Sequence, residues 1–115
     1  MSADPEIAGL EVVCSGAKRL DEAGSRFVYL PGLKVLVGEA TRVLDALLAI
    51  SAHSGYPTRL FLQEQLPERP TINGSPANWT QHMILGRCWW SWSWTGVPAT
   101  LSPVQILQAH LRALR

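Results

Sequence analysis

The stretch FVYLPGLKVLV, residues 27–37, contains two runs of β-favouring residues that flank Pro31 and Gly32. A Pro-Gly pair suits the central positions of a tight turn, so this stretch is predicted to form a β-hairpin. The next stretch, TRVLDALLAI at residues 41–50, leaves two interpretations open. Its apolar residues between 43 and 50 fall at helical spacing, yet the same residues suit a buried strand that follows the hairpin.

The segments on either side extend the β-rich pattern. Residues 10–16, LEVVCSG, are predicted to form a short strand, and residues 58–66, TRLFLQEQL, alternate as a strand does. Residues 67–79 contain three prolines and one glycine, which predicts a loop. Residues 86–101 show no clear period, so we expect an irregular segment that is held by aromatic packing.

The last segment, SPVQILQAHLRALR at residues 102–115, carries the signals of an amphipathic helix. Ser102 stands at the N-cap, Pro103 at the first helical position and Gln105 at the capping-box position. An apolar stripe follows, made of Val104, Leu107, Leu111 and Leu114. Strands followed by a loop and a helix predict an α+β fold in which this helix packs on a sheet.

Length and composition indicate one globular domain, residues 1–115, with an irregular N-terminus at residues 1–8. Hydrophobic residues make up 47%, charged residues 17%, and the formal net charge is +1, which excludes a disordered chain and a generally basic nucleic-acid binder. No apolar run approaches the roughly 18 residues that span a membrane. The first ten residues carry acids where a secretory signal needs basic residues. We therefore expect a cytoplasmic protein that contacts neither nucleic acid nor membrane.

The charges are unevenly distributed along the chain. All nine acidic residues lie between Asp4 and Glu68, and residues 69–115 carry four arginines and no acid. Cys88 lies in this acid-free part, directly after Arg87. The positive charge of Arg87 would favour the thiolate of Cys88, whereas burial among the tryptophans would favour the neutral thiol, so a reactive thiol and a core residue both stay open. The other cysteine, Cys14, follows apolar residues and is predicted to be a core residue. We expect both cysteines to remain thiols in a reducing compartment.

The order of these segments resembles the ubiquitin-conjugating (UBC-like) superfamily, particularly its compact bacterial members found with ubiquitin-like modification genes. HSGYPTRLFL at residues 53–62 resembles the family's tyrosine-proline turn and last strand. GRCWW at residues 86–90 resembles the segment that carries the nucleophile, and WTGVPATLSPVQIL at residues 94–107 resembles the tryptophan, proline and helix start that follow it. The resemblance covers Phe27 to Leu114. It implies an antiparallel β-meander, an irregular cysteine-bearing segment and a C-terminal amphipathic helix.

The resemblance also implies an activity. Cys88 would be the nucleophile that accepts a ubiquitin-like modifier as a thioester from an activating enzyme and transfers it to an amine of a target protein. The family's His-Pro-Asn tripeptide is absent, so Asn78 is the candidate oxyanion donor and His82 the candidate orienting residue or base. No cofactor is implied. In bacterial relatives such pathways serve antiviral defence, which extends to this chain only as an implication of the resemblance.

Two further readings of the residues stay open. Trp89, Trp90 and Trp92 would contact a protein partner if exposed, whereas rings of this size usually pack in a core. A noncatalytic binding module or adaptor of the same fold, which uses this tryptophan-rich segment, is therefore the alternative function.

A metal site is not expected, because no paired CxxC or HxxxH spacing is present. His110, on the last helix, is predicted to be partly buried.

Overall fold

In the part of the chain that the structure describes, two helices pack on one face of a six-stranded antiparallel sheet. The computed structural model describes residues 8–22, 24–37, 39–51, 57–66, 71–72, 75–92 and 97–114. The sheet order is β1-β2-β3-β4-β8-β7, and a separate two-stranded ladder joins β5 to β6. The elements are α1 (Ala8–Val13), β1 (Lys18–Glu22), β2 (Ser25–Val37), β3 (Ala40–Ala49), β4 (Arg59–Leu62), β5 (Thr71–Ile72), β6 (Ser75–Pro76), β7 (Thr80–Ile84), β8 (Arg87–Ser91) and α2 (Pro103–Leu114). The predicted α+β class with a C-terminal helix is confirmed.

The hairpin predicted at residues 27–37 is wrong, because this stretch lies within the single strand β2. Its register against β3 shifts between Leu30 and Leu33, so Pro31 and Gly32 form a β-bulge instead of a turn. Strand β1 pairs with β2 only as far as Tyr29, which leaves Pro31 outside that ladder, where its missing N–H costs nothing. Gly32 has a φ of 63°, a backbone conformation that glycine adopts without strain.

Residues 43–50 form a strand rather than a helix, and β3 includes all but the last of them. Leu44, Ala46 and Leu48 face the helices, and Leu47 and Ala49 face the opposite side of the sheet. Both faces of β3 are therefore covered at this end. The apolar residues fall at helical spacing only because buried side chains point to both sides.

The strand predicted at residues 10–16 is wrong. Residues 8–13 form α1, which buries Leu10, and Cys14 is buried directly after it. The N–H of Cys14 donates to the carbonyl of Leu10 at 2.8 Å, which continues the helical pattern by one residue. Gly16, with a φ of 97°, then turns the chain toward β1. Of the predicted irregular residues 1–8, Ala8 begins this helix, and the other seven lie outside the described residues.

The irregular segment predicted at residues 86–101 is wrong in its first part, where β7 and β8 form a hairpin. The two-residue turn consists of Leu85 and Gly86, with φ angles of 54° and 74°. Positive φ at both positions is the geometry that matches the twist of paired strands. The sequence of β8 shows no alternation of apolar and polar residues, because tryptophans occupy both faces of this strand. Cys88 therefore lies on a strand.

Two other predicted segments agree with the structure in part of their length. The strand expected at residues 58–66 is present only at residues 59–62, as β4. In the loop expected at 67–79, residues 71–72 and 75–76 form the short β5–β6 pair, and the described residues 77–79 are irregular. Helix α2 begins at Pro103, and Gln105 accepts hydrogen bonds from the N–H and hydroxyl of Ser102, both at 3.1 Å. None of the described helices has the length and apolar character that crossing a membrane requires.

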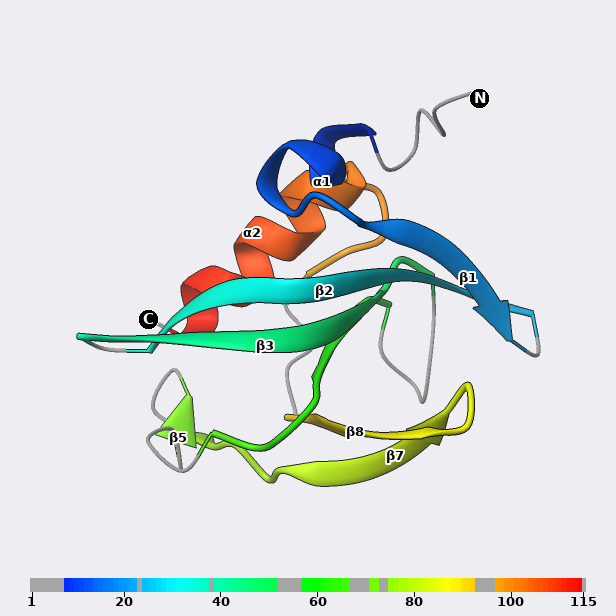
Figure 1. Cartoon of the computed structure of the whole chain (residues 1–115). Coiled ribbons are helices and arrows are strands. Elements are labelled where there is room, and N and C mark those ends of the chain that lie inside the picture. Colours follow the sequence, from blue (N-terminus) through cyan, green and yellow to red (C-terminus); the bar gives the residue numbers. More distant parts are fainter. Residues whose placement is uncertain are drawn as a thin grey trace.

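Two hydrophobic cores lie on opposite faces of the sheet. The larger core packs α1 and α2 against one face. The smaller core consists of Phe27, Leu47, Ala49, Phe61, Ile84 and Trp89. Figure 1 shows the helices on one side of β2 and β3 and the β7–β8 hairpin on the other side. The sheet therefore folds back on itself, and the smaller core lies inside this fold.

Candidate functional site

Cys88 is an exposed thiol on β8. It lies directly opposite Met83 of β7, and its Sγ is 3.8 Å from the Sδ of Met83. Cys14, by contrast, is buried and donates its S–H to the carbonyl of Pro31 at 3.2 Å. Burial, and next the negative charge of Asp45, raise the pKa of Cys14. Cys88 is therefore the accessible thiol, and Cys14 is the core residue that the sequence predicts.

The structure does not bring His82 to Cys88. His82 lies opposite Trp89 in the hairpin, whereas Cys88 lies opposite Met83. Directly opposed residues of an antiparallel pair share a face and successive residues alternate, so His82 and Cys88 point to opposite faces. The His82 Nε2 is 2.8 Å from the hydroxyl of Thr80, and its ring packs edge-on against Phe61. In this conformation His82 is not a base for Cys88.

Arg87 also points away from Cys88, because it is the preceding residue on the same strand. Its guanidinium donates to Oδ2 of Asp45 at 2.9 Å and to the hydroxyl of Tyr29 at 3.3 Å. The hydrogen bond to Asp45 is the main reason that the pKa of Arg87 is raised further. The predicted role of Arg87 in activating the thiol is therefore not what this geometry provides.

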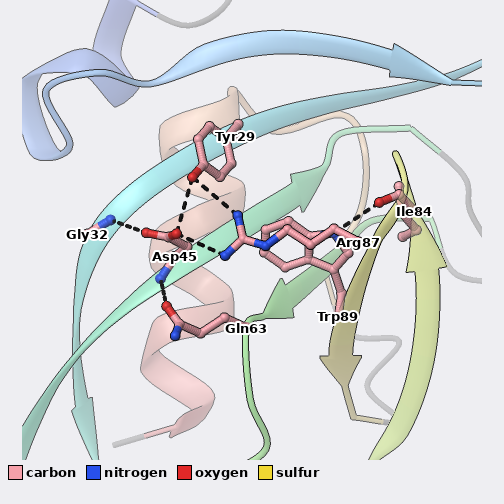
Figure 2. A network of polar contacts seen from close by, with 7 residues as sticks. All are labelled: Tyr29, Gly32, Asp45, Gln63, Ile84, Arg87 and Trp89. Atoms are coloured by element: carbon pink, nitrogen blue, oxygen red, sulfur yellow. Dashed lines mark hydrogen bonds and ion pairs between the residues drawn. The ribbon is translucent and has the colours of Figure 1, made fainter.

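Asp45 is the centre of a polar network that the sequence analysis did not identify as a site (Figure 2). Its carboxylate accepts hydrogen bonds from the N–H of Gly32 at 2.9 Å, from Arg87, and from the hydroxyl of Tyr29 at 3.2 Å. Its own N–H donates to Oε1 of Gln63. The hydrogen bond from Gly32, and next that from Arg87, hold the pKa of Asp45 below its ordinary value. The available signal was a single acid within the apolar run VLDALLAI.

Asn78 is exposed and lies two residues before Thr80, where β7 begins, and it has a φ of 52°. Thr80 begins β7 and pairs with Ser91, and Cys88 pairs with Met83, three residues further along β7. Three residues of a strand span about 10 Å, and Asn78 lies beyond that end. Asn78 and Cys88 are therefore at different ends of the hairpin, and the structure does not bring the candidate oxyanion donor to the thiol.

Two of the three tryptophans predicted to contact a partner are core residues instead. Trp89 is 2% exposed, and its indole N–H donates to the carbonyl of Ile84 at 3.2 Å. Trp92 is 1% exposed and packs against Trp79 and His110. Burial leaves neither ring exposed to a protein partner. Trp90 is half-buried and remains a candidate for partner contact, and Trp94 lies outside the described residues.

His110 lies on α2 and is fully buried. Its Nε2 is 3.0 Å from the hydroxyl of Thr58, which itself donates to the carbonyl of Val97 at 2.7 Å. The hydroxyl proton is thus used, and His110 Nε2 must be the donor in the first hydrogen bond. Burial, and next the charge of Arg59, lower the pKa of His110 to about 4. His110 is a neutral core residue at neutral pH.

Within the described ranges, no group of three or more His, Cys, Asp or Glu side chains is arranged to hold a metal ion. No family model, curated protein or solved structure matches the chain. The geometry defines an α+β protein whose six-stranded sheet folds back on itself. The β7–β8 hairpin presents the accessible thiol of Cys88 on one face. The partly exposed polar network of Asp45, Tyr29 and Arg87 lies on the other face.

Proposed function

We propose that this chain is a ubiquitin-conjugating-like protein of the UBC-like superfamily. It accepts a ubiquitin-like modifier as a thioester on Cys88 from an activating enzyme and transfers it to an amine of a target protein. The observation that carries the proposal is the exposed thiol of Cys88, on a hairpin that precedes the C-terminal helix. The resemblance of residues 27–114 supplies the identity of the acyl group, and with it a cytoplasmic place of action.

The proposed chemistry needs two acyl transfers. The Cys88 thiolate attacks the carbonyl carbon of the thioester on the activating enzyme, and the thiol of that enzyme leaves. The amine of the target then attacks the new thioester, loses a proton, and displaces the Cys88 thiolate. Because His82 and Arg87 lie on the other face of the hairpin, the proposal assigns only the carrier role to this chain. Deprotonation of the amine is left to the target or to solvent.

The experiment is a charging assay with the cognate activating enzyme, ATP and the modifier, read on non-reducing gels. We expect an adduct that thiol reductant removes. Cys88→Ser should give a reductant-resistant ester or no adduct, and Cys88→Ala should give none. Cys14→Ala is the matched control, and it should still be charged because Cys14 is buried. Absence of an adduct on the folded wild-type chain, or an adduct that persists in Cys88→Ala, would contradict the proposal.

A noncatalytic binding module of the same fold is the second candidate. The observation that favours it is the apolar surface next to Cys88, where Met83 is 70% exposed and Trp90 is half-buried on the same face of the hairpin. This module would bind the modifier through that surface without forming a covalent bond. The charging assay separates the two candidates, because the binding module forms no covalent adduct in it. The module binds the modifier noncovalently, and Cys88→Ala leaves that binding unchanged.

A further inference from the structure

A pocket of about 200 Å³ opens on the sheet face opposite the helices. Strands β1, β2 and β3 form one side of it, and the β7–β8 hairpin forms the other. Its lining residues are Lys18, Leu20, Tyr29, Leu47, Leu85, Arg87 and Trp89. Cys88 points to the other face of β8, so this pocket is separate from the site of the proposed acyl transfer.

The lining combines an apolar body with two cations. Leucine side chains and the rings of Tyr29 and Trp89, which meet edge-on at 6.3 Å, form the body. Lys18 and Arg87 supply the cations, and no carboxylate is among the described residues that line the pocket. A largely apolar pocket with a few convergent polar groups is the usual form of a small-molecule site. Because both charged residues in the lining are positive, the pocket favours an anionic ligand.

Arg87 is held in place before any ligand arrives. Asp45 and Tyr29 accept hydrogen bonds from two of its nitrogens, and its guanidinium carbon lies 4.7 Å from the centre of the Trp89 ring. Asp45 does not line the pocket, whereas Tyr29 and Arg87 do, so the guanidinium is held both by a residue outside the pocket and by one of the pocket walls. Its remaining N–H groups make no hydrogen bond to a described residue. A guanidinium that is already fixed loses little further conformational freedom when it binds a carboxylate.

Lys18 supplies the uncompensated charge. Its side chain is exposed on β1, and it makes no ion pair with the part of the chain that the structure describes. The charge of Arg87 is balanced by Asp45, so the positive charge of Lys18 is the one left unbalanced among the described residues that line the pocket. A single unbalanced positive charge matches a monoanion.

We propose that this pocket binds a small organic carboxylate that carries one apolar ring or short branched chain. The apolar part packs against Leu20, Tyr29 and Leu85, which have exposed surface in the pocket, and the carboxylate pairs with Lys18 and Arg87. The volume lies below the range of roughly 300–1,000 Å³ that is typical of drug-sized ligands, so a single ring is the upper limit. Planar, paired N–H donors make arginine a good partner for a carboxylate.

The test is an NMR titration of the whole chain with phenylacetate and with its neutral analogue phenylacetamide. We expect saturable shifts for phenylacetate at the Trp89 indole N–H and at the amides of Leu20 and Leu47. Phenylacetamide should bind at least about tenfold more weakly, as loss of one charge-assisted contact implies. Equal affinity for the two compounds, or no saturable shift with phenylacetate, would overturn the proposal.

Two exposed lysines on the sheet provide a matched pair of variants. Lys18→Gln should weaken phenylacetate by about fivefold to tenfold and leave phenylacetamide unchanged. Lys34→Gln changes a lysine of β2 that does not line the pocket, and it should leave both affinities unchanged. Equal weakening by the two variants would show general charge attraction and overturn the site. Cys88→Ala should bind phenylacetate normally, which keeps this result independent of the charging assay.

Discussion

Asp45 on β3 and Arg87 on β8 form an ion pair of 2.9 Å, although β4 lies between their two strands in the sheet. In a flat sheet, two strand spacings of about 4.8 Å each would separate their backbones. The long arginine side chain and the fold of the sheet bring the charges together. This contact therefore joins the β7–β8 hairpin to the central strands, on the face that the helices leave uncovered.

The first prediction concerns this ion pair. Asp45→Asn and Arg87→Gln should each lower the free energy of unfolding, and a double-mutant cycle should give a coupling energy of about 0.5–1 kcal/mol. The estimate is modest because the side chains of Arg87 and Asp45 are 43% and 30% exposed. Urea denaturation of the four proteins measures it. The longer pair of Arg19 and Asp21, at 3.7 Å, is the control and should show a smaller coupling. Equal couplings would contradict the prediction.

The second prediction concerns pH and His110. Its folded pKa of about 4 lies below the value of about 6.5 in an unfolded chain, so below pH 6.5 the unfolded state binds the proton first. The free energy of unfolding should therefore fall between pH 6.5 and pH 4, by up to about 3 kcal/mol from this group. His110→Gln keeps an N–H donor for Thr58 and cannot titrate. Denaturation at several pH values should show a flatter curve for this variant, and parallel curves would contradict the assignment.

The third prediction concerns the two thiols. Ellman's reagent should modify Cys88 rapidly in the native protein and Cys14 at least about a hundredfold more slowly, because Cys14 reacts only after local opening. Cys88→Ala should remove the fast phase and Cys14→Ala the slow one. In denaturant both thiols of the wild-type chain should react at similar rates. A fast phase that survives in Cys88→Ala would show that the buried position of Cys14 is incorrect.

The fourth prediction concerns the β7–β8 turn. Gly86 has a φ of 74°, and an added Cβ would meet no atom within 4 Å. Gly86→Ala should therefore destabilise the protein by about 1 kcal/mol through backbone conformation alone. Gly86→Asn is the matched variant and should cost less, because asparagine tolerates this region better than alanine. Thermal unfolding of the two variants checks the order, and a smaller cost for alanine would contradict it.

The sequence predicts those parts of the fold whose signals are local. The N-cap at Ser102, Pro103 and the capping-box position of Gln105 define the start of α2 without help from the rest of the chain. The bulge in β2 could not be predicted in this way. It depends on β3 as a partner on one side and on the end of β1 on the other, and both conditions arise only in the assembled sheet.

The site was less predictable than the fold, for the same reason. Their closeness to Cys88 in the sequence predicted that Arg87 activates its thiol and that His82 orients it or acts as a base. Strand alternation and the hairpin register instead place both side chains on the face of the hairpin opposite Cys88. The partner of Arg87 is Asp45, which lies 42 residues away in the sequence. Neither periodicity nor spacing indicates a contact that exists only because the sheet folds back over β4.

The bulge at Pro31 and Gly32 has a consequence for the whole second half of β2. Before it, Val28 and Leu30 face the helices; after it, Leu33, Val35 and Val37 do so. The extra residue thus shifts the inside-outside alternation by one position. With a uniform ladder, Lys34 would point into the larger core and Val35 into solvent. One residue of length in β2 therefore keeps the sequence of its second half in phase with the core, and it also frees the Gly32 N–H that binds Asp45.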